Sequence, residues 1–216
     1  MKKMNKVLIG EVTEFLSKCK IELDSWFEID LPMPELIVLH SAQDVAEIWD
    51  MKLGDDLPIA WADTGRQKLY MLQWDEAEKL RQKMPYDFWT ILKHEYVHFY
   101  WHAIVGTTMP IWMNEGLACY LAGQTFVLKD KNMIFNIRDY FDDNTFNAYA
   151  VGYVGVNYLI EKFGKETLLE FLKQLSDIVV STTKKIPVEA FEGLFKQQFG
   201  FGLTKGELKR LVEKLR

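Results

Sequence analysis

The pentapeptide at residues 94–98 constrains this chain more than any other feature. It reads H-E-Y-V-H, which has the form H-E-x-x-H, inside an apolar and aromatic segment at residues 86–106. In a helix, His94 and His98 lie one turn apart on the same face, where their imidazoles can converge on one ion. Glu95 is rotated by about 100° from His94, so it can meet a metal-bound water but is poorly placed as a ligand. Two neutral nitrogen ligands beside a base suit a hydrolytic zinc site. The alternative is an aromatic core helix with two coincidental histidines.

Length and composition are those of a globular enzyme. The chain has 216 residues, of which 49% are hydrophobic and 14% aromatic, enough to bury a full core. A net charge of −5 without a basic block argues against nucleic acid as a partner. Cys19 and Cys119 do not make a disulfide framework. The first apolar run, at residues 7–9, is too short for a signal peptide, and no run approaches the length of a membrane span. We therefore expect a cytoplasmic protein, whose oligomeric state the sequence does not indicate.

Hydrophobic periodicity predicts both strands and helices in the first part of the chain and mainly helices in the second part. This arrangement defines an α+β fold. Strands are expected at residues 35–40, 57–61 and 68–74, with a tight turn at 63–65. Helices are expected at residues 4–20, 41–50, 75–83, 86–106, 111–123, 148–163, 165–176, 187–199 and 204–215. Ser41 with Asp44, and Thr204 with Glu207, have the spacing of helix capping boxes.

One segment is ambiguous, and no domain boundary is evident. Residues 125–136 allow a small hairpin that turns at residues 130–132. We interpret residues 1–216 as a single domain with three approximate sub-regions. These are an N-terminal helix plus small sheet (1–84), the helices of the zinc site (85–176) and C-terminal helices (177–216).

A catalytic zinc ion usually takes three protein ligands plus water, so His94 and His98 need a further partner. His102 lies eight residues after His94, which is about 12 Å along a helix, and this is too far for a site with Zn–N distances of about 2 Å. We expect His102 to support the ligands, line the substrate cleft or pack in the core. The third ligand must therefore come from another element.

Glu115 is the candidate for this ligand. It lies in the stretch 112–121, which is apolar except at Asn114 and Glu115, and an unpaired carboxylate is costly to bury in such surroundings. A salt bridge is the alternative, but no lysine or arginine occurs between Lys93 and Lys129. This absence favours a metal ion as the partner of the carboxylate.

Together, H-E-x-x-H at residues 94–98 and W-M-N-E-G-L-A at residues 112–118 resemble the gluzincin metallopeptidases. The resemblance is strongest to the thermolysin-like catalytic domain of M1 aminopeptidases and to the smaller peptidase MA-like proteins, and it covers roughly residues 60–176. In that family the second motif reads W-x-N/S-E-G-x-A, and its glutamate, Glu115 here, is the third zinc ligand. The 16 residues between His98 and Glu115 are two fewer than in typical M1 members, which we interpret as a shorter loop. The resemblance implies a zincin-like, thermolysin-type fold with a small mixed sheet, an H-E-x-x-H helix and a helical C-terminal half.

The resemblance continues downstream. Residues 149–164 are similar to the M1 pattern Y-x-x-G-x-x-x-x-x-Y-L-x-x-x-x-G, whose first tyrosine, Tyr149 here, donates a hydrogen bond to the developing oxyanion. Tyr153 is the fallback for this role, and core packing is the alternative for both tyrosines. The G-x-M-E-N motif that binds the free amine in M1 enzymes is absent from residues 65–74, which favours an endopeptidase over an aminopeptidase. We expect residues 67–73 to form an edge strand that holds an extended peptide by backbone pairing.

The implied function is a zinc-dependent peptidase acting on a peptide or protein substrate. One Zn²⁺ per chain, held by His94, His98 and Glu115, would polarise the scissile carbonyl and lower the pKa of its water. Glu95 would act as general base and then return the proton to the leaving amine. Tyr149 would stabilise the oxyanion.

Two other functions remain open. The first is a non-catalytic protein that keeps the zincin scaffold for binding or regulation, although every expected catalytic position is present. The second is a purely structural zinc site, which would need a fourth protein ligand that the sequence does not suggest. Asn114 has two possible roles, either orienting a ligand or the substrate backbone, or capping the helix that carries Glu115.

Overall fold

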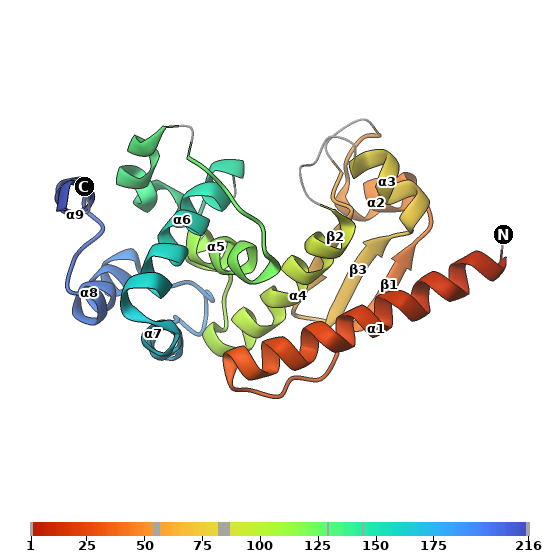
Figure 1. Cartoon of the computed structure of the whole chain (residues 1–216), viewed down its shortest axis with the longest axis horizontal. Coiled ribbons are helices and arrows are strands. Elements are labelled where there is room, and N and C mark those ends of the chain that lie inside the picture. The colour runs from red at the N-terminus through yellow and green to blue at the C-terminus, as the bar shows by residue number, and fades with distance from the viewer. Residues whose placement is uncertain (1, 54–56, 82–86, 129, 144, 215–216) are drawn as a thin grey trace. The chain divides into compact units, whose positions relative to one another are not determined.

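A computed structural model of the chain describes residues 2–53, 57–81, 87–128, 130–143 and 145–214 (Figure 1). It is a mixed α+β protein with a small sheet in its first part and helices throughout its second, as the periodicity predicted. The chain divides into two compact units, the N-terminal unit (residues 1–100) and the C-terminal unit (residues 101–216). The interpretation of residues 1–216 as a single domain stays a prediction.

The N-terminal unit contains a three-stranded mixed sheet. Its elements are α1 (Lys2–Phe27), β1 (Glu35–Leu39), α2 (Ala42–Trp49), β2 (Ala60–Asp63), β3 (Lys68–Leu72), α3 (Trp74–Arg81) and most of α4 (Phe88–Val105), which continues into the C-terminal unit. The predicted helix at 75–83 corresponds to α3 as far as Arg81, and residues 82 and 83 lie outside the described part of the chain. Likewise, residue 86 at the start of the predicted H-E-x-x-H helix lies outside it.

Strand β3 lies between β1 and β2, parallel to the first and antiparallel to the second (Figure 1). The prediction that residues 67–73 form an edge strand is therefore wrong, because both edges of β3 are already paired and cannot accept a peptide. The predicted strand at 57–61 is displaced, since the pairing with β3 begins at Ala60 and ends at Asp63. Leu57 and Ile59 precede this strand and are buried, so their apolar character is explained by burial in the core.

Local sequence signals explain the elements around the sheet. The Ser41 side chain accepts a hydrogen bond from the Asp44 backbone N–H, and the Asp44 carboxylate accepts one from Ser41, which confirms the predicted capping box at the start of α2. Leu69 and Met71 of β3 are fully buried on one face of the sheet. The alternation along β3 puts Tyr70 on the opposite face, where its side chain is half-buried.

Helices α1 and α4 run side by side in the same direction within the N-terminal unit. Phe15 contacts Trp89 with ring centroids 5.0 Å apart, and further along both helices the Lys93 amine donates to Glu22 at 2.7 Å. The Tyr100 hydroxyl then donates to the Asp24 carboxylate at 2.7 Å. These contacts fix the part of α4 that carries residues 94–98.

The C-terminal unit is helical. Beyond the end of α4 it contains α5 (Ile111–Ala122), the 3-10 helix η1 (Lys131–Tyr140), α6 (Phe146–Phe163), α7 (Lys165–Asp177), α8 (Val188–Phe199) and α9 (Lys205–Lys214). The predicted helices are confirmed, with residue 215 of the last lying outside the described part of the chain. Gly106, Gly123 and Gly200 follow α4, α5 and α8 with φ of 75–80°, a backbone conformation that suits glycine. The Thr204 hydroxyl accepts from the Glu207 N–H at 3.4 Å and donates to its carboxylate at 2.8 Å.

The hairpin interpretation of residues 125–136 is wrong for the residues that the structure describes. Instead, η1 begins after Asp130, whose carboxylate accepts a hydrogen bond from the Asn132 backbone N–H at 2.9 Å and so caps the helix. Ile137 of η1 and Phe141 just beyond it are buried. Helical capping and burial therefore outweigh the turn signal at residues 130–132.

None of the helices in the described part of the chain is both long enough and apolar enough to cross a membrane.

Candidate functional site

Helix α4 carries the three residues of the H-E-x-x-H sequence on a buried stretch of the N-terminal unit. His94 is 4% exposed, and the side chains of His98 and Glu95 are 13% and 17% exposed. The imidazole rings of His94 and His98 are 4.9 Å apart between centroids and nearly perpendicular. The i, i+4 spacing therefore brings the two rings to one face of the helix, as the sequence predicted.

These three side chains form a compact donor set. One potential ligand atom from each of His94, Glu95 and His98 lies within 4.8 Å of the other two. Two atoms bound to the same zinc ion at about 2 Å can be at most about 4 Å apart, so a small side-chain adjustment would let both imidazoles reach one ion. Imidazole nitrogen is also a ligand type that zinc prefers. The residues present thus fit a divalent transition metal.

Glu95 is held in place by the sheet. Its Oε2 accepts a hydrogen bond from the Ala62 backbone N–H at 3.2 Å and lies 4.0 Å from His98 Nε2. The carboxylate therefore lies between the histidine pair and strand β2.

The backbone of β2 offers further hydrogen-bonding groups on its outer edge. The Leu72 N–H donates to the Ile59 carbonyl at 2.8 Å, so the alternation of an antiparallel ladder directs the N–H and C=O of Trp61 toward β3. The corresponding groups of Ala60 and Ala62 are directed outward, which agrees with the Ala62–Glu95 hydrogen bond. In the described part of the chain, no strand pairs with this edge of β2.

Glu115 and Asn114 lie on α5 in the C-terminal unit. Both are buried, at 8% and 4% exposure. The Asn114 amide donates to the Thr108 carbonyl at 3.3 Å, and Pro110 occupies the N-cap position of α5. The suggestion that Asn114 caps this helix is therefore wrong, since it lies inside the first turn and holds the preceding loop instead. That Glu115 joins His94 and His98 as a ligand stays a prediction.

Tyr149 and Tyr153 lie one turn apart on α6 of the C-terminal unit, and both are half-buried. The ring of Tyr153 packs against Phe126 with centroids 6.1 Å apart, which is the packing role anticipated as an alternative. The oxyanion role of Tyr149 stays a prediction.

Two glycines bring α5 and α6 unusually close. A Cβ placed on Gly116 would lie 2.2 Å from the Gly152 carbonyl carbon, and one on Gly152 would lie 1.9 Å from the Trp112 carbonyl oxygen. Only glycine fits at both positions, because the two backbones are in direct contact. This contact fixes the register between the helix that carries Glu115 and the helix that carries Tyr149.

His102 is half-buried at the end of α4, in the C-terminal unit. Burial, together with the charge of Lys184, lowers the pKa of His102 below its usual value. That His102 supports the ligands, lines the substrate cleft or packs in the core stays a prediction.

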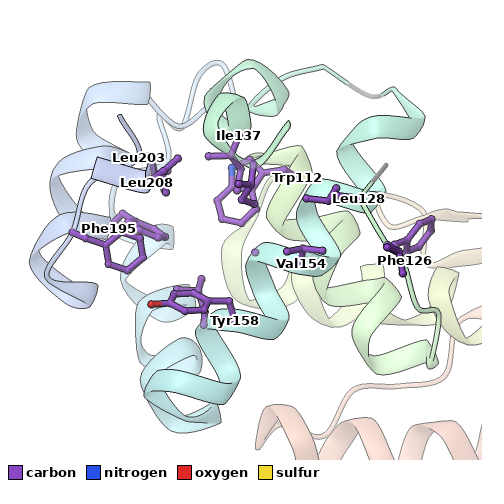
Figure 2. A pocket seen from close by; sticks show the side chains of 14 residues that line it. Trp112, Phe126, Leu128, Ile137, Val154, Tyr158, Phe195, Leu203 and Leu208 are labelled. Atoms are coloured by element: carbon purple, nitrogen blue, oxygen red, sulfur yellow. The ribbon is translucent and has the colours of Figure 1, made fainter. Parts of the chain in front are cut away.

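The C-terminal unit also contains an apolar cavity of about 390 Å³ that the sequence did not indicate. It is lined almost entirely by hydrocarbon side chains from α5, η1, α6, α8, α9 and the segments 126–128 and 201–203 (Figure 2), among them Trp112, Ile137, Val154, Phe195 and Leu208. Tyr158 contributes the main polar group, and its hydroxyl already accepts a hydrogen bond from Lys162 at 2.7 Å. A catalytic site needs several convergent polar groups, so this cavity does not compete with the residues of α4 as the candidate centre.

Two comparisons with known proteins give no match. No model of a protein family matches the chain, and a search of curated proteins finds no similar sequence.

Proposed function

We propose that this chain is a zinc-dependent peptidase of the gluzincin type with a zincin-like fold, in which His94, His98 and Glu115 hold the metal. The observation that carries the proposal is the placement of Glu95, which lies within 4.0 Å of His98 and bonds the outward N–H of Ala62. A base between a pair of imidazoles and a strand edge that no other strand of the described residues joins is suited to peptide hydrolysis. An aromatic core helix with coincidental histidines would not require this arrangement.

Each residue has a chemical task in this proposal. When bound, zinc supplies a Lewis acid and a water of lowered pKa. Glu95 accepts a proton from the attacking water and passes it to the leaving amine, so that the peptide bond is exchanged for a carboxylate and an amine. Tyr149 donates a hydrogen bond to the carbonyl oxygen as negative charge develops there.

In this proposal, the outer edge of strand β2, rather than residues 67–73, holds an extended peptide by backbone pairing. An extended peptide would pair with the outward N–H and C=O groups of Ala60 and the C=O of Ala62. Binding through backbone groups in mid-strand does not require a free amino terminus. This supports the endopeptidase activity that the missing G-x-M-E-N motif favours.

The alternative is a zincin scaffold that binds peptides without cleaving them. The burial of His94 beside His98, with Glu95 directed at β2, favours the enzyme, because a binding protein does not need a base at that position. A purely structural zinc site is disfavoured because it would need four protein ligands, and the group found among the described residues has three members, of which Glu95 is poorly placed as a ligand.

The test compares wild-type protein with Glu95→Gln on a library of quenched fluorescent peptides, with metal content measured by mass spectrometry. Glu47→Gln makes the same chemical change on an exposed face of α2 and serves as the control. We expect Glu95→Gln to retain zinc and lose about 100-fold to 10,000-fold in cleavage rate, the usual contribution of a general base. Stoichiometric zinc without cleavage by the wild type would refute the enzyme and leave the binding protein.

A further inference from the structure

An aromatic row ends at the outer strand of the sheet in the N-terminal unit. Trp61 of β2 is directly paired with Tyr70 of β3, and their rings are stacked with centroids 4.7 Å apart and planes inclined by 5°. Trp49, the last residue of α2, packs edge-on against Trp61 at 5.6 Å and is 48% exposed. Trp61 and Tyr70 are half-buried. The row thus presents partly exposed aromatic surface at the edge of the sheet, one residue before Ala62 and its contact with Glu95.

The hydrogen-bonding register of β2 determines how the residues of an added strand would pair with Trp61. Because the N–H and C=O of Trp61 point toward β3, an antiparallel peptide on the outer edge would bond Ala60 and Ala62 and would leave Trp61 in a non-hydrogen-bonded pair. Paired residues project their side chains to the same face of a sheet. In a non-hydrogen-bonded pair the Cα atoms are only about 4.5 Å apart, so the two side chains are in close contact.

We propose that Trp61 selects substrates carrying an aromatic or large aliphatic side chain at the position directly opposite it. This inference rests on the proposed peptidase function and names its substrate class. A side chain at that position extends the row formed by Tyr70 and Trp61 and covers aromatic surface that water otherwise contacts. A small side chain at the same position leaves that aromatic surface exposed to water. A charged side chain there would have to give up part of its hydration to contact the surface.

The alternation of a strand makes the preference specific to register. Shifting the large side chain by one residue along the peptide moves it to the other face of the sheet, away from Trp61. There its neighbours on β2 are the methyl groups of Ala60 and Ala62, which offer little surface for contact. The expected preference is therefore confined to one position rather than spread over the peptide.

The experiment uses alanine-rich quenched fluorescent peptides in which a single phenylalanine is moved through successive positions. The full-length protein with zinc is assayed as wild type, Trp61→Ala and Trp61→Leu. The measured quantity is the ratio of kcat/KM for each phenylalanine peptide to that for the all-alanine peptide. This ratio does not depend on the fraction of folded enzyme, so a partly unfolded variant remains informative. Trp61→Leu, which keeps an apolar side chain, provides a second variant should Trp61→Ala unfold.

We expect the wild type to prefer phenylalanine at one position by about fivefold, which corresponds to about 1 kcal/mol for an aromatic cross-strand pair. Trp61→Ala should remove this preference, Trp61→Leu should reduce it, and neighbouring positions should show none. Cleavage without a preferred position, or a preference that Trp61→Ala retains, would overturn the inference while leaving the peptidase function standing. A wild type that binds zinc but cleaves no peptide would overturn the proposed function and this inference with it.

Discussion

The contact between Gly116 and Gly152 leads to the most quantitative expectation for this fold. A Cβ added by Gly152→Ala would lie 1.9 Å from the Trp112 carbonyl oxygen, whereas real Cβ contacts essentially never fall below 3.0 Å. The neighbouring atom is backbone in a helix, so relief requires α5 and α6 to separate by about 1 Å. Overpacking of a core typically costs about 1–3 kcal/mol, and a clash between two backbones belongs at the upper end of that range.

The matched control is Gly193→Ala. Gly193 lies inside α8, and a Cβ there would meet no atom within 4 Å. The same chemical change should therefore stabilise the protein by about 0.5–1 kcal/mol, because alanine restricts the unfolded chain more than glycine does. The two substitutions should move stability in opposite directions.

The assay is urea unfolding followed by circular dichroism, with stability taken from the midpoint at unchanged m. We expect Gly152→Ala to lower the free energy of unfolding by about 3 kcal/mol, or the melting temperature by about 6–12 °C for a protein of this size. A Gly152→Ala protein as stable as wild type would refute the close approach of α5 and α6. If Gly193→Ala instead lowered stability as much as Gly152→Ala, glycine replacement itself, rather than the contact, would be responsible.

Three further expectations concern capping, burial and pH. Ser41→Ala should destabilise the protein by about 1 kcal/mol in the same urea assay, since it removes the side-chain acceptor for the Asp44 N–H, and an unchanged midpoint would contradict the capping box. Burial raises the pKa of the Cys19 thiol to about 11, so it should resist thiol reagents at pH 8 until the protein unfolds; rapid labelling of the native protein at this residue would contradict its burial. Burial and Lys184 lower the pKa of His102, so the unfolded state takes up this proton first and stability should fall as the pH drops below about 6.5. His102→Gln should make the difference in urea midpoint between pH 7.5 and pH 5.5 smaller than in wild type, and an unchanged difference would exclude His102 as its source.

Features that depend on a few neighbouring residues were predictable from the sequence. The spacing of the two histidines fixes their common face on α4, because helical geometry is local. Gly106 and Gly123 mark the ends of α4 and α5, and Ser41 marks the start of α2, since caps are formed by residues close in sequence. The split into a mixed part and a helical part follows from the same local periodicities.

Features that depend on long-range pairing were not predictable in this way. The order of strands in the sheet is set by which edges meet, and nothing within residues 67–73 shows that both edges are paired. The one available signal is that Leu69, Met71 and Leu72 are all apolar, which is more typical of a central strand than of an edge. The contact between Glu95 and Ala62 joins residues 33 apart in sequence, and only the fold brings them together.

Zinc binding tests the proposed metal ligands His94, His98 and Glu115 most directly. Zinc per chain and its affinity are measured for wild type and Glu115→Gln, which keeps the shape of the side chain but removes its charge. Glu161→Gln, an exposed change on α6, is the control. Loss of a residue that only supports a ligand typically costs about 10-fold to 100-fold in metal affinity, so loss of a ligand itself should cost more than about 100-fold. We predict one zinc per wild-type chain, retained by Glu161→Gln and lost or greatly weakened in Glu115→Gln. A wild-type chain that binds no zinc, or a Glu115→Gln protein that binds it as tightly as wild type, would contradict the proposed centre.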